Sequence, residues 1–386
     1  TPRKYYRIFC VRCIASVVFL VLREKWESIA SLIGESRVKR KGCSFMNKSM
    51  LGIIDATTHM DEMSELTWKR SAAAVPFGGR YRLIDFVLSN MVNSGISSVA
   101  IFPKYQYRSL MDHLGSGKQW DLNRKRDGLF FFPSSEKSLL DGIGSFQQFK
   151  ENEDFFLRSS QKYVVLTNSY TVCNMDYKIM LNRHLDNKCD ITHVRQLGKS
   201  LDVFILEKSL LIELFSNADK TGYRNISDVI RDPKSDLMIC DYDYDNFVAI
   251  IDSVNSYYQN SLALLNPTVW KQVFRREQPI FTKVKDEPPT KYSKEAFVKN
   301  SMIANGAIIE GHVENSIIFR GVKVEKGAVI KNSIVMQKSI VEANAVLECV
   351  ILDKDVKVEQ GTVLRGEQFE PYLLKKGTIQ GALMNS

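Results

Sequence analysis

The chain has 386 residues, of which 44% are hydrophobic and 25% charged, a balance typical of a globular protein with room for two buried cores. Its net charge of +9 is concentrated at the start: residues 1–45 carry ten Lys or Arg against three Glu, a charge of +7 that leaves +2 for the remainder. A nearly neutral body excludes the basic groove expected of a DNA- or RNA-binding protein.

Residues 1–45 differ in character from the rest of the chain. The apolar run 14–22 comes after a basic start, as in a signal peptide, but it is too short to span a bilayer and no clear cleavage site comes after it. Met46 opens a segment that reads like a natural protein start. We therefore predict that 1–45 is a disordered or non-native extension; the alternative is a basic arm that lies on an anionic membrane surface.

The seven cysteines are scattered along the chain. Cys10 and Cys13 form a single C-x-x-C, which without a second pair is a weak metal or redox signal. The sequence therefore predicts no disulfide framework and no metal site. A protein of this kind is expected in the reducing cytoplasm, without a membrane partner.

Residues 46–265 alternate between two kinds of pattern. Short β-rich apolar runs at 51–55, 97–103, 163–168 and 202–206 are separated by helical patterns such as 86–96. This alternation predicts an α/β domain with a mostly parallel sheet and helices on both faces. Ligands of such domains bind at the carboxyl ends of the strands.

Three consecutive 17-residue copies come next, at 316–332, 333–349 and 350–366. Their apolar positions recur every six residues within a copy and align in three columns: Ile318, Val335 and Leu352; Val324, Val341 and Val358; Ile330, Leu347 and Leu364. This hexapeptide spacing predicts a three-sided parallel β-helix over 299–386, with 306–315 as an irregular cap. Residues 266–298 are interpreted as the linker between the two domains.

Four segments closely resemble bacterial glucose-1-phosphate adenylyltransferase, also called ADP-glucose pyrophosphorylase: 74–96 (AVPFGGRYRLIDFVLSNMVNSGI), 115–124, 175–184 and 255–267. The resemblance implies a Rossmann-like nucleotidyltransferase domain followed by a left-handed β-helix. In that family glucose-1-phosphate attacks the α-phosphate of ATP and releases pyrophosphate. Catalysis depends on a glycine-rich loop, basic residues and carboxylate-bound Mg²⁺.

The chain departs from the family at the phosphate loop. Where the family has Gly-Gly-x-Gly-Thr-Arg-Leu, residues 57–63 read TTHMDEM, so no glycine remains and Glu62 stands at the arginine position. Ala72-Ala73 replaces a Lys-Pro, and residues 144–147 (GSFQ) replace Gly-Thr-Ala-Asp. An acid in place of a cation repels a triphosphate.

The two carboxylates that hold Mg²⁺ in the family are replaced as well. The resemblance places Tyr170 and Ile250 at their positions, and isoleucine offers no oxygen ligand. Asp252 is the one candidate surrogate. A stretch that contributes to glucose-1-phosphate binding in the family is shortened between Asp190 and Leu201. We therefore expect no catalytic residue and no cofactor, with Mg²⁺ held only by a catalytic partner.

Several retained residues are candidates for a different task. Arg80, Arg82, Lys104, Lys118 and Trp120 are candidates for binding a phosphorylated metabolite effector or a partner protein; solvated or ion-paired surface is the alternative. The Gly78-Gly79 pair fits either a phosphate cradle or a tight turn, and the turn is the commoner explanation.

The favoured hypothesis is a regulatory, catalytically inactive D-type subunit that assembles with a catalytic adenylyltransferase paralogue, as a heterotetramer, in glycogen biosynthesis. One alternative is an active nucleotidyltransferase with a metal site rebuilt around Asp252. Another is a purely structural scaffold. A hexapeptide-repeat acyltransferase with His312 as its base is a remote alternative from a different class of enzyme.

Overall fold

The centre of the fold is β1 (Met50–Ala56), every residue of which is buried. It lies between β4 (Ser98–Pro103) and β6 (Tyr163–Asn168) and runs parallel to both. A strand with apolar side chains on both faces is typical of a parallel sheet that helices cover on each side. The structure is a computed structural model, which describes residues 49–381 except residues 59, 104–105 and 134–142.

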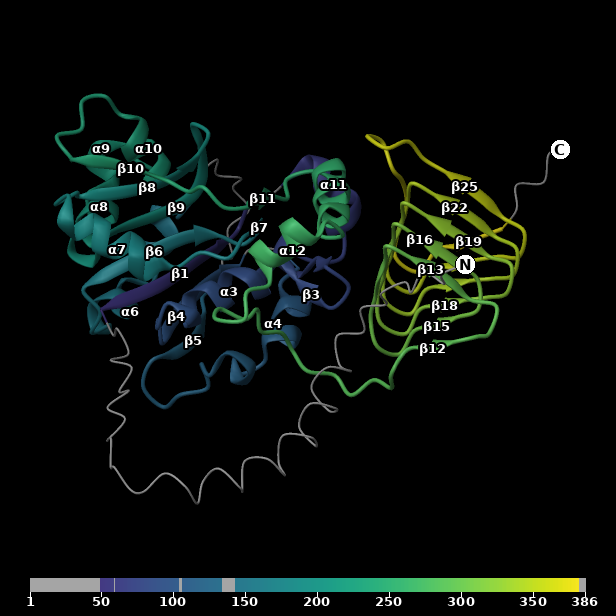
Figure 1. The fold of residues 1–386 in the computed structure, drawn as a ribbon. Coiled ribbons are helices and arrows are strands. Elements are labelled where there is room, and N and C mark those ends of the chain that lie inside the picture. The colour runs from purple at the N-terminus through teal and green to yellow at the C-terminus, as the bar shows by residue number, and fades with distance from the viewer. Residues whose placement is uncertain (1–48, 59, 104–105, 134–142, 382–386) are drawn as a thin grey trace, which may run out of the picture. The chain divides into compact units, whose positions relative to one another are not determined.

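The main sheet has seven strands among the described residues, and β9 is the one that runs antiparallel to its neighbours. The predicted mostly parallel sheet is therefore confirmed (Figure 1). Across the sheet the strand order is β10 (Ile239–Asp243), β8 (Ile191–Gln196), β9 (Lys199–Glu207), β6, β1, β4 and β5 (Gly128–Phe131).

Helices cover both faces of this sheet. One hydrophobic cluster joins the sheet to α3 and α7, and another joins its opposite face to α5, α6 and α8. The helical elements are η1 (Asp61–Met63), α2 (Ser64–Thr67), η2 (Ala72–Ala74), α3 (Leu83–Asn93), α4 (Arg108–Leu114), η3 (Lys118–Trp120), α5 (Phe146–Glu151), α6 (Glu153–Arg158), α7 (Tyr177–Asp186), α8 (Lys208–Ser216), α9 (Ala218–Thr221), α10 (Ile226–Arg231), α11 (Val254–Ala263) and α12 (Pro267–Val273).

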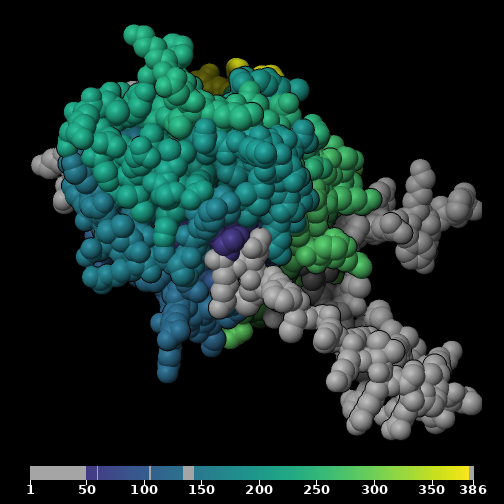
Figure 2. All heavy atoms as spheres, turned by 90° about the vertical axis from the view of Figure 1, so that its left-hand side faces the viewer, coloured from purple at the N-terminus to yellow at the C-terminus, as the bar shows by residue number. Residues whose placement is uncertain are grey.

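Two small antiparallel pairs complete this part of the chain. They are β2 (Pro76–Phe77) with β3 (Tyr81–Arg82), and β7 (Thr171–Val172) with β11 (Ala249–Ile250). The end of the sheet that carries β10 and α8 to α10 faces the viewer in Figure 2, where teal and green segments form the surface.

The C-terminal part is the predicted left-handed β-helix, in which short strands stack into three parallel sheets. All nine residues of the predicted apolar columns are buried, eight of them completely. The stacked strands begin at Lys291, because β12 and the first two residues of β13 lie within 266–298, the segment interpreted as a linker. The same segment also contains α12.

The strands of the three sheets are, for the first, β12 (Lys291–Tyr292), β15 (Ile308–Ile309), β18 (Lys323–Val324), β21 (Ile340–Val341), β24 (Lys357–Val358) and β27 (Ile379–Gln380); for the second, β13 (Phe297–Lys299), β16 (His312–Glu314), β19 (Val329–Lys331), β22 (Val346–Glu348) and β25 (Val363–Arg365); and for the third, β14 (Met302–Ile303), β17 (Ile317–Ile318), β20 (Ile334–Val335), β23 (Val350–Leu352) and β26 (Tyr372–Leu374).

The third sheet of the β-helix packs against the nucleotidyltransferase-like part. Its outward side chains Ile317, Ile334 and Ile351 are fully buried in a cluster that includes Phe77 and Tyr257. Burial of five large apolar side chains at this contact stabilises it by several kcal/mol (about 1.5–3 kcal/mol for each). The β-helix is therefore fixed to the rest of the chain by a hydrophobic core.

The structure corrects one expectation about the cysteines. Cys189 and Cys240 form a disulfide, although the sequence predicted none. The two residues are 51 positions apart, and the pairing of β8 with β10 brings them together, a contact that no local pattern reveals. Cys10 and Cys13 lie outside the described residues, as does the rest of the predicted extension. None of the helices in the described ranges is long and apolar enough to cross a membrane.

Candidate functional site

The two positions that the resemblance assigns to metal carboxylates lie side by side. β7 pairs with β11 so that Ile250 is opposite Thr171, and the Ile251 N–H donates to the Tyr170 carbonyl oxygen at 3.2 Å. These short strands come after the carboxyl end of β6, the edge where ligands of α/β sheets bind. The two positions are thus adjacent on paired strands, and they carry a phenol and an isoleucine where the resemblance places carboxylates.

Tyr170 is a buried, neutral donor. Its side chain belongs to a hydrophobic cluster, and its hydroxyl donates to Asp202 Oδ2 at 3.2 Å. Burial, together with the nearby carboxylate of Asp202, raises the pKa of the Tyr170 hydroxyl far above its ordinary value. A phenol that stays protonated and an isoleucine do not replace two hard oxygen anions, so these positions do not fit Mg²⁺.

The charge of Asp252, the candidate surrogate ligand, lies close enough to Tyr170 to contribute to the raised pKa of that hydroxyl. Asp252 comes directly after β11 and Ile251, its carboxylate is exposed, and its backbone N–H donates to Ser256 Oγ at 3.0 Å in the first turn of α11. In the parts of the chain that the structure describes, no three His, Cys, Asp or Glu side chains are grouped so that they could hold a metal ion.

Asp55, at the end of β1, is a feature of the site that the sequence analysis missed. Its Oδ1 accepts hydrogen bonds from the Thr57 N–H at 2.8 Å and hydroxyl at 2.6 Å, and its Oδ2 accepts one from the Gly144 N–H at 2.6 Å. Burial raises the pKa of this carboxyl, although the three hydrogen bonds act in the opposite direction. Asp55 thereby ties the altered phosphate loop to the altered Gly-Thr-Ala-Asp segment. An acid at the end of a buried strand, shortly before two threonines, was the available signal.

The predicted effector and interface residues do not form one group. Arg80 and Lys118 are exposed, and the Arg80 guanidinium lies 5.4 Å from the centre of the Tyr81 ring. Arg82 donates through Nη1 to the Ser109 carbonyl oxygen at 2.6 Å. Lys104 lies outside the described residues.

Trp120 is a core residue and offers no surface to a ligand. Its side chain is 2% exposed, and its indole N–H donates to Ser89 Oγ at 3.3 Å. The ring also packs edge-on against His113, 6.0 Å away between centroids. Trp120 is therefore buried by its own domain.

Cations converge instead between the nucleotidyltransferase-like part and the β-helix. Burial first, and then the nearby Arg82 and Arg70, lower the pKa of Lys354 to about 7. Burial also lowers the pKa of Arg82 to about 10, and Arg70 and Arg320 act in the same direction. Asp353, the acid next to Lys354, is already paired with Arg70. We call Arg82, Arg320 and Lys354 the cation cluster; Asp85 acts on both arginines, and Glu287 on Arg320, in the direction that favours their charged forms.

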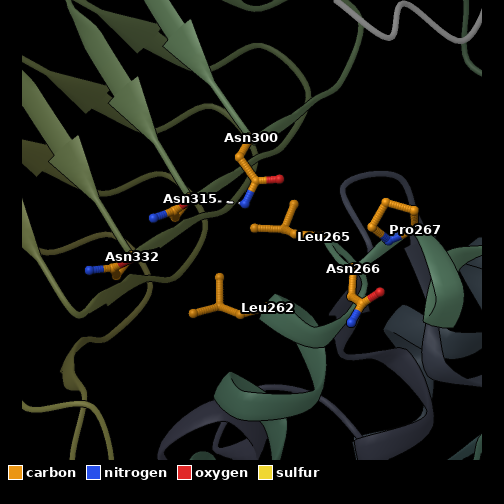
Figure 3. Close-up of a pocket in the computed structure, with 7 residues that line it drawn as sticks. All are labelled: Leu262, Leu265, Asn266, Pro267, Asn300, Asn315 and Asn332. Carbon is orange, nitrogen blue, oxygen red and sulfur yellow. Dashed lines mark hydrogen bonds between the residues drawn. The ribbon is translucent and has the colours of Figure 1, made fainter. Parts of the chain in front are cut away.

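A groove of about 490 Å³ lies between the α11–α12 turn and one corner of the β-helix. Figure 3 shows Leu262 and Leu265 on one wall and a column of asparagines, Asn300, Asn315 and Asn332, on the other. These asparagines have φ between 43° and 47°, a left-handed turn conformation that asparagine tolerates well. The described side chains that line the groove are uncharged.

His312, the candidate acyltransferase base, lies on the outer side of β16. Its Nε2 is 3.5 Å from Glu314 Oε2, and its ring lies 4.5 Å from that of Phe297. These two contacts are with its own strand and with the neighbouring β13, and the groove in Figure 3 does not include this histidine.

Comparison with known proteins agrees with this architecture. Residues 61–199 match the nucleotidyl transferase family, and residues 288–370 match the GlmU-like C-terminal hexapeptide family. The chain is 53% identical over 341 residues to the glycogen biosynthesis protein GlgD of Bacillus subtilis (strain 168), covering 88% of this chain and 99% of the relative.

A second relative, the glycogen biosynthesis protein GlgD of Geobacillus stearothermophilus, is 58% identical over 343 residues, 88% of this chain and 100% of that protein. The glucose-1-phosphate adenylyltransferase of Bacillus anthracis is more distant, at 27% identity over 349 residues, 79% of this chain and 92% of the relative.

Proposed function

Because the chain belongs to the family of the glycogen biosynthesis protein GlgD, which is related to glucose-1-phosphate adenylyltransferase, we propose that it is a non-catalytic regulatory subunit of that enzyme. One observation carries the proposal. The two metal positions are adjacent, as the reaction requires, but they hold a buried phenol and an isoleucine. The fold of a nucleotidyltransferase is thus kept, while these two positions offer no anionic oxygen to a metal.

The phosphate side of the site supports the same proposal. Adenylyl transfer needs donors and cations around the triphosphate. Here the loop after β1 presents Thr57 and the exposed Glu62, and two of its N–H and O–H donors are used by Asp55. Loss of one electrostatic group at an active site raises the barrier by about 3–4 kcal/mol, so several losses together abolish turnover.

In this proposal the chain acts through association. It forms a hetero-oligomer with a catalytic paralogue in the cytoplasm, most simply a heterotetramer, and Mg²⁺ binds only in the catalytic subunit. Binding energy at the interface favours the conformation of that subunit that accepts its substrates. A phosphorylated metabolite is the effector that the cation cluster Arg82, Arg320 and Lys354 suits, because guanidinium and ammonium groups form charge-assisted hydrogen bonds with phosphate oxygens.

The test is pyrophosphate release from ATP and glucose-1-phosphate in the presence of Mg²⁺, measured for this chain alone, for a catalytic glucose-1-phosphate adenylyltransferase from the same source alone, and for a mixture. We expect no release by this chain and a raised kcat or lowered KM in the mixture. The matched control adds an equal concentration of an unrelated protein to the catalytic subunit. Turnover by this chain alone would refute the proposal. Association without any kinetic change would favour a structural scaffold.

A further inference from the structure

A second pocket, of about 390 Å³, lies at the edge of the main sheet where β6 begins. Its lining includes Tyr163, the first residue of β6, and Glu207, the last residue of the antiparallel strand β9. The two metal positions come after the carboxyl end of β6, so this pocket is at the opposite edge of the sheet and is separate from the site described above. Its volume is within the range of pockets that hold small molecules.

His184, on α7, forms part of the buried floor of this pocket. The residue is 3% exposed, and its Nδ1 lies 2.9 Å from Thr192 Oγ1. Its Nε2 has no hydrogen-bond partner in the part of the chain that the structure describes. Because Nδ1 is occupied by Thr192, Nε2 is the ring nitrogen left for the pocket. A buried polar atom of this kind is costly unless water or a ligand satisfies it.

The hydrogen-bond network assigns the proton of this ring. Thr192 is 2% exposed, and among the described residues the partner of its hydroxyl is His184. A buried hydroxyl needs an acceptor for its proton, so Thr192 donates to Nδ1 and the ring carries its proton on Nε2. Burial lowers the pKa of His184, although Asp190 and Glu207 act in the opposite direction, so the ring is neutral at pH 7. His184 therefore offers one N–H donor to an oxygen atom of a ligand.

The rim of the pocket supplies several acceptors. Asp190, Glu207 and Glu213 all line it. Asp190 Oδ2 accepts from the Met238 N–H at 2.8 Å, and Glu207 Oε1 accepts from the Ser209 hydroxyl at 2.8 Å, which leaves one oxygen of each without a hydrogen bond. The exposed carboxylate of Glu213 has no hydrogen bond or ion pair within the described ranges. A ligand of this rim must bring more than one donor.

The same rim carries one cation and an apolar surface. Lys188 is exposed and forms no ion pair with any residue that the structure describes. Leu185 and Leu210 line the pocket, and the Tyr163 ring packs edge-on against that of His184, 5.8 Å away between centroids. Donors, acceptors and an aromatic ring thus surround one cavity.

These groups restrict the chemistry of the ligand. A phosphate would face three carboxylates against one lysine, and a simple amine offers only donors, which leaves the His184 N–H without an acceptor. The zwitterion of an amino acid matches both signs, but its one ammonium group cannot use three separate carboxylates. Each hydroxyl of a sugar both donates and accepts, and the C–H face of its ring packs on aromatic and leucine side chains.

We propose that this pocket binds a neutral, unphosphorylated sugar. A hydroxyl oxygen of the sugar accepts from His184 Nε2–H, and other hydroxyls donate to the carboxylates of Glu213, Asp190 and Glu207. The inference does not rest on the proposed function, because every group that it uses belongs to this chain and the pocket is separate from the altered metal positions.

The test is binding of glucose and of maltose to the full chain alone, measured by isothermal titration calorimetry. His184→Phe keeps an aromatic ring and removes the N–H, and Glu213→Ala removes acceptors from an exposed helical position. One matched control is Glu277→Ala, at an exposed glutamate outside the pocket. The other is Asn315→Gly, which removes an amide from the groove of Figure 3 and suits its positive φ.

At least one of the two sugars should bind with a Kd of about 1 mM or tighter. His184→Phe and Glu213→Ala should each weaken the Kd by about three- to tenfold, as expected for the loss of one hydrogen bond. Both control variants should bind within about twofold of the wild type. The thermal midpoint of each variant shows whether it is folded, and if His184→Phe is not, Glu213→Ala decides the test.

Three results would overturn the inference. The first is failure of both sugars to bind at about 10 mM. The second is unchanged binding by Glu213→Ala, or a loss that is confined to Asn315→Gly, which would assign the sugar to the groove of Figure 3. The third is displacement by L-leucine or glucose-1-phosphate at lower concentrations than the sugar itself requires, because the pocket would then select a zwitterion or an anion.

Discussion

The ion pair between Arg70 and Asp353 gives the sharpest test of how the β-helix is fixed to the rest of the chain. Their side chains are 5% and 0% exposed, and Arg70 Nε also donates to the Leu66 carbonyl oxygen at 2.8 Å. Replacement Asp353→Ala leaves the guanidinium buried without its anion. Breaking a buried pair in this way lowers the free energy of unfolding by about 3–5 kcal/mol.

We expect a loss of stability in the upper part of this range because other cations lie near the pair. Arg82 and Lys354 lie close enough to Arg70 for their charges to interact with it. Without Asp353 the three cations face one another with less compensation, and the loss of stability should decrease as salt screens them. At about 2 °C per kcal/mol for a chain of this size, the thermal midpoint should fall by about 6–10 °C.

Calorimetry or circular dichroism of three variants provides the assay. Asp154→Ala removes one partner of an exposed pair, whose side chains are 81% and 82% exposed, and should cost less than about 1 kcal/mol. The double variant Arg70→Leu/Asp353→Leu removes both charges and should recover much of the loss, because no unpaired charge remains. If Asp353→Ala is no less stable than Asp154→Ala, the buried pair does not hold the two parts together.

Three further predictions concern the site and the sheet edge. Tyr170→Asp combined with Ile250→Asp should still release no Mg²⁺-dependent pyrophosphate, because the phosphate loop stays altered; turnover in the pyrophosphate assay would show that only the metal ligands were missing. The pKa of Lys354, about 7, is below the ordinary value of 10.5, so the folded chain binds fewer protons than the unfolded chain between these pH values. Relative to Lys354→Met, the wild type should therefore gain stability as pH rises from 7 to 10, by at most about 1.4 kcal/mol per pH unit in urea titrations, and parallel pH profiles would contradict this. Without reductant, Cys189→Ser should lower the free energy of unfolding by up to about 4 kcal/mol, because it opens the loop that the disulfide closes. In dithiothreitol the variant should be almost as stable as the wild type, whose disulfide is then reduced. An equal loss in dithiothreitol would exclude the disulfide as the cause.

The β-helix could be predicted almost completely because its information is local and repeated. One apolar residue every six positions marks each side of the β-helix. Because the three copies repeat the same pattern, their alignment identifies Val324, Val341 and Val358 as an interior column without any knowledge of contacts. The parallel sheet could be predicted for a similar reason, since β1 is apolar on both faces.

The features that could not be predicted depend on contacts between residues that are far apart in the sequence. Asp55 meets Gly144 across 89 positions, and Arg70 meets Asp353 across 283. Neither partner carries a local signal for the other. The same applies to the outward side chains of the third β-helix sheet: Ile317 and Ile334 alternate with interior residues, and only the folded chain shows that a second hydrophobic surface covers them.

The segment that resembles the catalytic family most closely is explained by packing. Gly78 and Gly79 have φ of 57° and 79° and form the turn between β2 and β3, so the interpretation as a tight turn is supported. A Cβ on Gly78 would lie 3.2 Å from Leu264, and one on Gly79 would lie 3.9 Å from Ile317 of the β-helix. The positive φ favours glycine at both positions, and at Gly78 the close approach of Leu264 adds a second reason.

The packing segment 74–96 and the family's phosphate and metal positions therefore differ in how far this chain keeps the residues of the family. Arg82, the last residue of β3, donates its backbone N–H to Asp85 and its guanidinium to Ser109, which fixes the start of α3. By contrast, the family positions whose only task is to hold phosphate or metal carry Glu62, Tyr170 and Ile250. A neutral loss of sequence constraint would erode packing and chemistry alike. This pattern is the one expected of the proposed regulatory subunit, because such a chain needs its fold to hold its surfaces in place but does not need the phosphate and metal ligands.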